Sequence, residues 1–481
     1  MSLDLKKIKF NKEKVAFCRF KKLGNQYLLT NEPNSHIFLE ESDFKKFLEG
    51  KLKKNSKIYK ELQSKNFIKD DLDLNQVTRK CHCYNNFLFQ GPSLHIIVVT
   101  LRCNFKCVYC QASSCPVDQK KYDMDIKTAK KTVDIIFESP NDVINIEFQG
   151  GEPLLNWSVL SFIVKYAKKK NKEAKKDLSF SLVSNFSLMT EEKYKFLTEQ
   201  GIGLCTSLDG PEELQNKNRP WPGKNSYETT IRWIKKIKKK EKEQMKKDKK
   251  PFFLSALTTI SRFSLKYPRE IIKEYVKWDF NGIHLRPLSF LGLSGGSAKG
   301  KVGYSAEEFI DFWKKSMDYL IEINQRGKFF YERGTRIMLR KILTDQNPSF
   351  VDLLSPCGAA IGQLLYNYNG KVYTCDEGRM VKGDTFMLGD VKTDNYEKII
   401  LNPKVKTMIA ASILENLPCD NCVYKPYCGV CPVLSYALYG TLFPQIKNTT
   451  QCKIHQAMLD YIFSGLQNKK VEEVFLNWIK R

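Results

Sequence analysis

Three cysteines stand at a spacing that suits metal chemistry: Cys103, Cys107 and Cys110 form a C-x3-C-x2-C run after the apolar segment 95–101. Cysteine thiolates are the usual ligands of [4Fe–4S] clusters, so three of them on one short loop leave a fourth iron without a protein ligand. An open coordination position separates a reacting metal site from a closed structural one. Zinc needs a fourth ligand, and a disulfide suits a secreted chain. The loop therefore predicts a reactive iron–sulfur site.

This loop, with Tyr109 inside it, resembles the signature of radical S-adenosylmethionine (SAM) enzymes. The resemblance implies that the open iron binds the amino and carboxylate groups of SAM, and that Tyr109 belongs to the cofactor-binding loop. It also implies that an electron, from a donor such as flavodoxin or ferredoxin, splits SAM. The products are methionine and a 5′-deoxyadenosyl radical, which takes a hydrogen atom from the substrate.

Strands and helices alternate from residue 94 to about 326. The expected strands are 94–100, 143–149, 178–184, 203–208, 252–260 and 282–289, with helices such as 125–139 and 305–323 between or after them. Nearly continuous apolar runs are typical of parallel strands covered on both faces. Six β/α units predict an α/β fold, a partial (β/α)6 radical SAM barrel over 90–330, whose active site lies at the carboxyl ends of the strands.

The second expected strand ends at Gly150-Gly151-Glu152-Pro153. Glycine allows a close approach between backbone and ligand. Glu152 is able to accept hydrogen bonds from a bound amino group. The segment resembles the family's GGEP motif, which holds the SAM amino group.

Ser184 and Asn185 end the third expected strand, where the family contacts the SAM ribose. The family has Gly at the next position, and this chain has Phe186. This difference questions whether the backbone keeps the same geometry there.

Ser207 and Asp209 end the fourth expected strand, and Arg219 follows ten residues after Asp209. By resemblance, Ser207 and Asp209 belong to the cofactor site, and Arg219 matches the arginine that pairs with the SAM carboxylate. A guanidinium fork suits bidentate carboxylate binding. A surface ion pair is the alternative for Arg219. Arg286, at the end of the sixth strand, is assigned no role.

Seven further cysteines lie near the C-terminus: Cys357, Cys375, Cys419, Cys422, Cys428, Cys431 and Cys452. Their C-x2-C-x5-C-x2-C core suits zinc or an iron–sulfur cluster. The whole set resembles the SPASM extension, which carries two auxiliary [4Fe–4S] clusters in radical SAM enzymes that modify ribosomal peptides or proteins. The predicted SPASM domain covers 350–465.

The resemblance divides these cysteines between two clusters. It gives one complete cluster to Cys419, Cys422, Cys428 and Cys452, and the other to Cys357, Cys375 and Cys431. Two residues, Gly429 and Val430, separate Cys428 from Cys431, whereas the family usually has three residues there. Sulfatase-maturing relatives have another cysteine near Gln363, so the second cluster is predicted to be open to substrate or to a noncysteine ligand.

Asp376 directly follows Cys375. In sulfatase-maturing relatives an Asp at this position is proposed to take a proton from the substrate, and a carboxylate near the radical suits general-base work. A solvated turn residue is the alternative.

The first 80 residues are predicted to form a separate unit. Short strands at 15–22, 26–30 and 36–40 precede helices at 42–50, capped by Ser42, and at 58–66. The order resembles the PqqD-like elements of peptide-modifying systems, which capture a leader peptide as an extra strand at the sheet edge. A structural extension is the alternative. Cys81 and Cys83 are predicted to be free surface thiols, because two thiols make no complete metal site; a cluster ligand is the alternative.

The chain has 481 residues, 79 Lys and Arg against 53 Asp and Glu, and a formal charge of +26. Charge runs such as 235–250, with helical spacing, indicate a solvated helix face, and no RNA-binding motif accompanies them. We therefore expect no nucleic-acid partner.

No apolar stretch is long enough for a membrane span, and the N-terminus lacks the apolar core of a signal peptide. A cytoplasmic location is expected, where 15 cysteines indicate metal or redox chemistry.

These observations predict a radical SAM oxidoreductase that modifies a ribosomally made precursor peptide and forms a carbon–carbon or thioether crosslink. The layout resembles that of His-Xaa-Ser type maturases. A second hypothesis is an anaerobic sulfatase-type maturase that oxidises Cys or Ser to formylglycine. From other classes, a nucleic-acid-binding iron–sulfur protein and a structural zinc protein are the alternatives.

Overall fold

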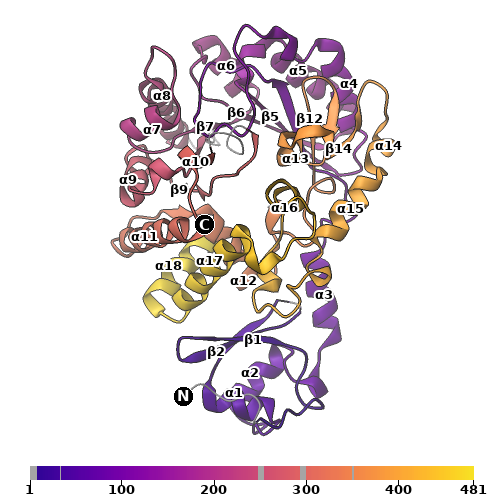
Figure 1. Ribbon diagram of the computed structural model, residues 1–481, viewed down its shortest axis with the longest axis vertical. Coiled ribbons are helices and arrows are strands. Elements are labelled where there is room, and N and C mark those ends of the chain that lie inside the picture. The colour runs from indigo at the N-terminus through magenta and orange to yellow at the C-terminus, as the bar shows by residue number, and fades with distance from the viewer. Residues whose placement is uncertain (1–7, 33, 247–253, 293–298, 349–350, 481) are drawn as a thin grey trace.

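The protein is described by a computed structural model that covers residues 8–32, 34–246, 254–292, 299–348 and 351–480. Figure 1 shows an N-terminal unit at the bottom, a sheet covered by helices at the top, and the C-terminal segment between them. Among the described residues, no helix is both long enough and apolar enough to span a membrane.

The central sheet has nine strands in the order β10-β8-β7-β6-β5-β4-β12-β13-β14. Its first six strands, all parallel to their neighbours, are β4 (Leu94–Thr100), β5 (Val143–Gly150), β6 (Asp177–Val183), β7 (Gly203–Ser207), β8 (Leu254–Thr259) and β10 (Leu285–Arg286). Their order along the sheet follows their order along the chain. The predicted open α/β sheet is confirmed.

The sixth predicted strand, 282–289, is wrong in part. It divides into β9 (Gly282–Ile283) and β10, and β9 pairs instead with β11 (Tyr331–Glu332) in a separate two-stranded sheet. The Leu285 N–H donates to the Glu332 side chain at 3.2 Å, and Pro287, which has no N–H, follows β10. A longer strand would need the N–H groups of these residues for pairing, but the Leu285 N–H is bonded to a side chain and Pro287 has none.

Helices cover the sheet and bury their apolar sides in one large core. They include α4 (Ile126–Ile136), α5 (Trp157–Ala174), α6 (Glu191–Glu199), α8 (Ser226–Met245), α9 (Pro268–Lys277) and α11 (Ala306–Gln325). Ser305 and Glu308 form a capping box that fixes the start of α11. The Lys-rich run 235–250 extends α8 as far as the structure describes it; residues 247–250 of that run and residues 252–253 of the predicted strand 252–260 lie outside the described residues.

Three strands from the C-terminal segment extend the sheet, which the sequence did not predict. β12 (Gln363–Tyr366) pairs with β4 in parallel, and β13 (Lys371–Tyr373) and β14 (Met387–Asp390) continue antiparallel. β12 lies next to the strand that leads into the cysteine loop. The pairing therefore brings the C-terminal segment to the barrel at β4.

The N-terminal unit has its own core and a three-stranded antiparallel sheet. Its elements are β1 (Arg19–Leu23), β2 (Gln26–Thr30), β3 (His36–Glu40), α1 (Glu41–Leu48), α2 (Lys57–Ser64) and α3 (Leu74–Tyr84). Two predictions are corrected: the first strand begins at Arg19, and Glu40 occupies the N-cap of α1, so Ser42 lies inside that helix. α3 was not predicted, and it carries Cys81 and Cys83.

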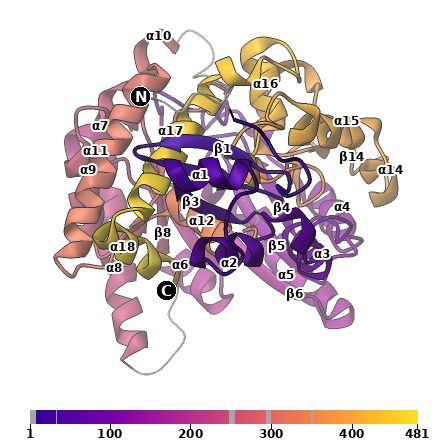
Figure 2. The same cartoon turned by 90° about the horizontal axis from the view of Figure 1, so that it is seen from below.

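The N-terminal sheet packs against α17 (Thr450–Leu466), as seen from below in Figure 2. The buried ring of Phe463 lies 5.5 Å from the ring of His36, 6.2 Å from Phe38 and 5.8 Å from Tyr424. Lys21 forms an ion pair with Asp460 at 2.6 Å. An aromatic cluster with a polar rim thus joins the N-terminal unit to the C-terminal segment.

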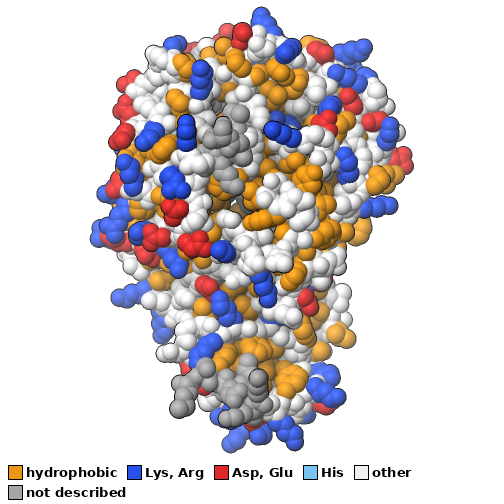
Figure 3. Space-filling view, in the orientation of Figure 1, with side chains coloured by type: hydrophobic (Ala, Val, Ile, Leu, Met, Phe, Trp, Pro, Cys, Tyr) orange, Lys and Arg blue, Asp and Glu red, His pale blue; other side chains and the backbone are white. Residues whose placement is uncertain are grey.

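The positive charge is spread out. On the face in Figure 3, Lys and Arg are interspersed with Asp and Glu and form no continuous stripe. Many pair with carboxylates, such as Lys170 with Asp134 at 2.7 Å. This face shows no phosphate-binding track of the kind that nucleic acid requires.

Replacing Phe463 by Ala is expected to destabilise the protein by about 3–5 kcal/mol, because the buried ring leaves a cavity at the junction. Thermal unfolding and limited proteolysis before α3 measure this change. The control Phe443→Ala removes a ring that is 54% exposed and is expected to change stability by less than about 0.5 kcal/mol. Equal effects of the two substitutions would contradict the role given to Phe463.

Candidate active site and metal centres

The cysteine loop follows β4 directly and is held by its backbone. The Cys103 N–H donates to the Cys115 carbonyl at 2.9 Å, and the Val108 N–H donates to the Asn218 carbonyl at 2.9 Å. These bonds fix the loop without using the thiols. All three cysteines of the loop are half-buried.

The loop thiols fit an iron–sulfur cluster with three cysteine ligands. Burial raises the pKa of Cys107 to about 12. Burial also raises the pKa of Cys103, and the charges of Glu152, Cys107 and Cys110 add to the shift, so the three sulfurs lie near one another. The Phe105 N–H donates to Cys103 Sγ at 3.4 Å. Because Cys103 and Cys107 are protonated at neutral pH without metal, cluster binding must release protons.

The Gly150–Gly151 pair brings the end of β5 against this loop. The Gly151 N–H donates to the Thr100 carbonyl at 2.9 Å, and the Glu152 N–H donates to the Arg102 carbonyl at 2.7 Å. A Cβ on Gly151 would lie 2.3 Å from the Arg102 oxygen, and one on Gly150 would lie 2.2 Å from the Thr100 oxygen. Both positions therefore require glycine.

Glu152 is fully buried, and its carboxylate ties β5 to β6. Its oxygens accept hydrogen bonds from the Ser184 hydroxyl at 2.8 Å, the Leu154 N–H at 3.0 Å and the Asn185 N–H at 2.9 Å. Burial raises the pKa of Glu152, and these bonds oppose the shift. A carboxylate has about four acceptor positions, so about one remains for a ligand amino group. Ser184, predicted at the ribose, points its hydroxyl to Glu152.

Phe186 keeps the backbone conformation that glycine favours. Its φ is +60°, in the left-handed region, and its ring is fully buried in the core. This conformation costs a non-glycine residue about 1–2 kcal/mol. Burying the ring offsets that cost. The side chain of Asn185 next to it donates to Asn104 Oδ1 at 3.2 Å, a contact that the sequence did not indicate.

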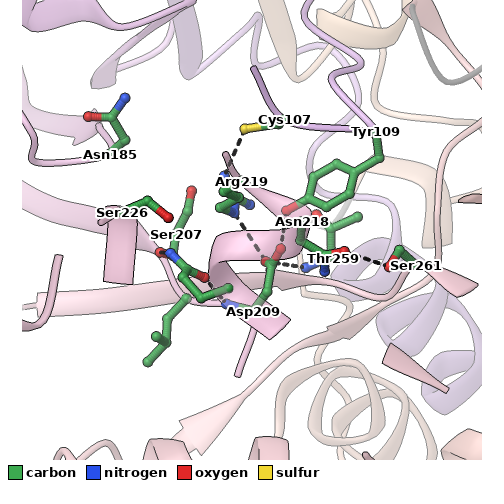
Figure 4. A network of polar contacts seen from close by, with 12 residues as sticks. Cys107, Tyr109, Asn185, Ser207, Asp209, Asn218, Arg219, Ser226, Thr259 and Ser261 are labelled. Carbon is green, nitrogen blue, oxygen red and sulfur yellow. Dashed lines mark hydrogen bonds and ion pairs between the residues drawn. The ribbon is translucent and has the colours of Figure 1, made fainter. Parts of the chain in front are cut away.

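Tyr109, Asp209 and Arg219 meet beneath the cysteine loop, as Figure 4 shows. The Tyr109 hydroxyl donates to the fully buried Asp209 carboxylate. Arg219 Nε lies 3.2 Å from Asp209 Oδ1, and its Nη1 lies 4.0 Å from Cys107 Sγ. The Arg219–Asp209 pair is buried, so the surface alternative is wrong. Ser207 takes part through its carbonyl, which accepts from Gln215 Nε2 at 3.1 Å.

Four C-terminal cysteines line one cavity together with His455 and Gln456: Cys419, Cys422, Cys428 and Cys452. Gln456 Nε2 donates to Cys452 Sγ at 3.3 Å, and His455 Nδ1 lies 3.4 Å from Cys428 Sγ. Of the described residues, only Cys375, Asp376 and Glu377 bring three ligand atoms within 4.8 Å of one another. Four cysteine side chains around one cavity suit either a [4Fe–4S] cluster or zinc.

The remaining trio, Cys357, Cys375 and Cys431, is buried in a second apolar cluster. Cys375 caps the short helix α13 (Asp376–Met380), which begins with Asp376. The charge of Asp376 contributes to the raised pKa of Glu147 on β5, after burial. The Asp376 carboxylate is therefore close enough to Glu147 for their charges to interact.

The chain matches known proteins in sequence. Residues 97–247 match the radical SAM superfamily. This segment is similar to radical SAM proteins. The cofactors of that family are a [4Fe–4S] cluster and SAM.

Two relatives show how far the likeness extends. An uncharacterized protein of Methanocaldococcus jannaschii is 30% identical over 196 residues, which covers 41% of this chain and 63%, less than two thirds, of that protein. A cysteine-type anaerobic sulfatase-maturating enzyme of Clostridium perfringens is 25% identical over 70% of this chain and 88% of its own length.

Two solved structures share the fold. The structure named native anSMEcpe with bound AdoMet has a TM-score of 0.65 and 20% identity over 78% of this chain and 99% of that chain. Streptococcus suis SuiB bound to S-adenosylmethionine has a TM-score of 0.53 and 14% identity, over 92% of this chain and 99% of that chain. Further structures of the two proteins hold the Kp18Cys peptide and the precursor peptide SuiA, respectively.

Replacing Gly151 by Ala is expected to push the end of β5 away from the cysteine loop and to cost about 1–3 kcal/mol of stability. SAM affinity is expected to fall about tenfold or more, which corresponds to ~1.4 kcal/mol. Thermal unfolding and equilibrium dialysis of reconstituted protein with SAM measure both. Gly203→Ala is the control, because its Cβ would have no contact closer than 3.6 Å. Unchanged SAM binding in Gly151→Ala would contradict the assignment.

Proposed function

We propose that this chain is a radical SAM maturase that modifies a ribosomally made precursor peptide and closes a carbon–carbon or thioether crosslink in it. The observation that carries the proposal is the sorting of ten cysteines into three groups, one on the loop after β4 and two in the C-terminal segment. One open cluster is enough to start radical chemistry, and further clusters suit the oxidation of a product radical. SuiB, which is bound to a precursor peptide in one structure, has the same fold.

The loop cysteines would hold the SAM-binding cluster, which together with SAM supplies a 5′-deoxyadenosyl radical. The protein itself binds and orients. Arg219 directs Nε toward Asp209 and Nη1 toward Cys107 Sγ, so Nη2 is the nitrogen that would meet the SAM carboxylate. Glu152 keeps the end of β5 in place and has about one acceptor position for the amino group. Tyr109 and Asp209 hold Arg219 from below and exclude water.

The C-terminal cysteines would hold two auxiliary clusters, one on the set of four and one on the trio. The predicted SPASM domain, 350–465, includes both sets and the β12–β14 extension of the sheet. Asp376 lies beside Cys375 of the trio and is our candidate for the group that removes a proton from the substrate.

The N-terminal unit would bind the leader of the precursor. Among the described strands of its sheet, β1 and β3 each have one neighbour only, so each presents a free edge. Unpaired backbone groups at such an edge bind an extended peptide as an added strand. The docking against α17 would fix the leader relative to the catalytic domain.

Formylglycine formation in a sulfatase is the second candidate. The sequence likeness to the Clostridium perfringens enzyme extends over 70% of this chain. Asp376 serves both candidates equally. A peptide containing a sulfatase motif distinguishes them, because oxidation of its Cys or Ser to an aldehyde changes the mass without joining residues.

Replacing Cys103, Cys107 and Cys110 by Ala is expected to abolish 5′-deoxyadenosine formation and to remove about four of about twelve irons per chain, because three clusters bind four irons each. Iron analysis and chromatography of anaerobically reconstituted protein measure both. SAM cleavage retained in this variant would refute the loop assignment. A parent protein with only four irons would refute the auxiliary clusters.

Removing residues 1–73, which leaves α3 in place, is expected to weaken precursor binding about tenfold, or ~1.4 kcal/mol, with little change in SAM cleavage. Fluorescence anisotropy with the labelled precursor encoded beside this gene measures the affinity, and SAM cleavage is the control for folding. Unchanged peptide affinity would reject leader recognition. Mass spectrometry of that precursor after coexpression tests the crosslink.

A further inference from the structure

Three of the seven C-terminal cysteines meet without a fourth. Cys357, Cys375 and Cys431 come from three separate segments and are only 3%, 2% and 5% exposed. A [4Fe–4S] cluster on this trio would have one iron without a cysteine ligand. A buried iron with a vacant position favours a nearby anionic oxygen or sulfur as its fourth ligand.

A carboxylate lies at that place. The ligand atoms of Cys375, Asp376 and Glu377 lie within 4.8 Å of one another. Cys375 and Glu377 are held on the first turn of α13, and the Gly378 N–H donates to Cys375 Sγ at 3.3 Å. Backbone geometry therefore fixes the carboxylates relative to one trio sulfur.

The two carboxylates lie next to each other, and burial together with the charge of Asp376 raises the pKa of Glu377 well above its usual value. Burial is the main cause of the raised pKa of Cys357, Cys375 and Cys431, and the charge of Glu377 adds to the shift at all three. The charge of Asp376 is a main cause at Cys375 alone among the three. Glu377 is thus the carboxylate on this helix that is near the whole trio.

Glu377 also contacts the barrel. Arg286, at the end of β10, places Nη2 3.2 Å from Glu377 Oε1. The Glu377 side chain also has a hydrogen bond with Asp376, so the arginine and the neighbouring acid together fix its orientation. Hydrogen bonds from outside a metal site commonly orient the ligands in this way.

We propose that the Glu377 carboxylate is the fourth protein ligand of the cluster on Cys357, Cys375 and Cys431, and that Arg286 is the residue that positions it. The inference rests on the proposed function, which assigns a cluster to this trio. It gives the chain an oxygen ligand in place of the cysteine that relatives have near Gln363. It also separates the roles of two adjacent acids, Glu377 toward iron and Asp376 toward the substrate.

The test uses full-length protein in which Cys103, Cys107 and Cys110 are replaced by Ala, so that only the auxiliary clusters contribute. Glu377→Ala in this background is expected to lose about one iron per chain on mild oxidation and to gain the electron paramagnetic resonance signal of a three-iron cluster. Glu377→Cys is expected to keep all irons and to lower the reduction potential, because a thiolate donates more charge than a carboxylate. Arg286→Ala is expected to shift the potential with no loss of iron.

Asp376→Ala is the matched control and is expected to keep all irons and the parent spectrum, while the loss of a charge beside Cys375 shifts the potential, as in Arg286→Ala. Asp352→Ala tests the other carboxylate whose charge reaches Cys357 and Cys431. The inference is overturned if Glu377→Ala matches its parent in all three measurements, or if Asp352→Ala alone loses the iron. The parent protein could also bind only about four irons, which corresponds to one auxiliary cluster. If its spectrum is then unchanged by Cys357→Ala, the trio holds no cluster, and the proposed function is overturned as well.

Discussion

Two main-chain hydrogen bonds beyond the paired part of β4 and β5 hold the whole site together. The N–H groups of Gly151 and Glu152 donate to the carbonyls of Thr100 and Arg102, on the segment that leads into the cysteine loop. The distance between these backbones excludes any side chain at Gly151. The loop is therefore built against its neighbouring strand, and its cysteines have a fixed position relative to every later strand of the sheet.

Buried charge then links the successive strand ends. Glu152 accepts three hydrogen bonds, two of them from the end of β6, and Asp209 after β7 pairs with Arg219 and Tyr109. A buried carboxylate is costly unless it is paired or hydrogen-bonded. Because both carboxylates are hydrogen-bonded or paired with protein groups, they act as structural links between strand ends, and Glu152 keeps about one acceptor position for a ligand.

The C-terminal segment belongs to the same sheet. β12 pairs with β4, so the hairpin that precedes Cys375 grows from the edge of the barrel itself. The trio of cysteines is placed near the barrel by backbone hydrogen bonds that do not depend on a flexible linker. The ion pair of Arg286 with Glu377 adds a side-chain link between the last barrel strand and α13.

The sequence alone determined the local features: five of the six barrel strands, the cysteine loop, and the glycines at the end of β5. Each of these features depends on a pattern of a few consecutive residues, such as an apolar run or a short spacing. Contacts with distant parts of the chain have little effect on such local patterns. The site members Asp209 and Arg219 were found by resemblance, and the structure brought them together with Tyr109.

Only the tertiary structure decided the long-range relations. It showed that β12 joins β4, that Ser184 serves Glu152, that Phe186 keeps a left-handed backbone, and that Glu377 lies beside the cysteine trio. These contacts join residues distant in the chain or choose between neighbouring side chains that differ little in composition. Strand order and side-chain direction depend on packing of the whole core, and that packing is not encoded in any short stretch of sequence.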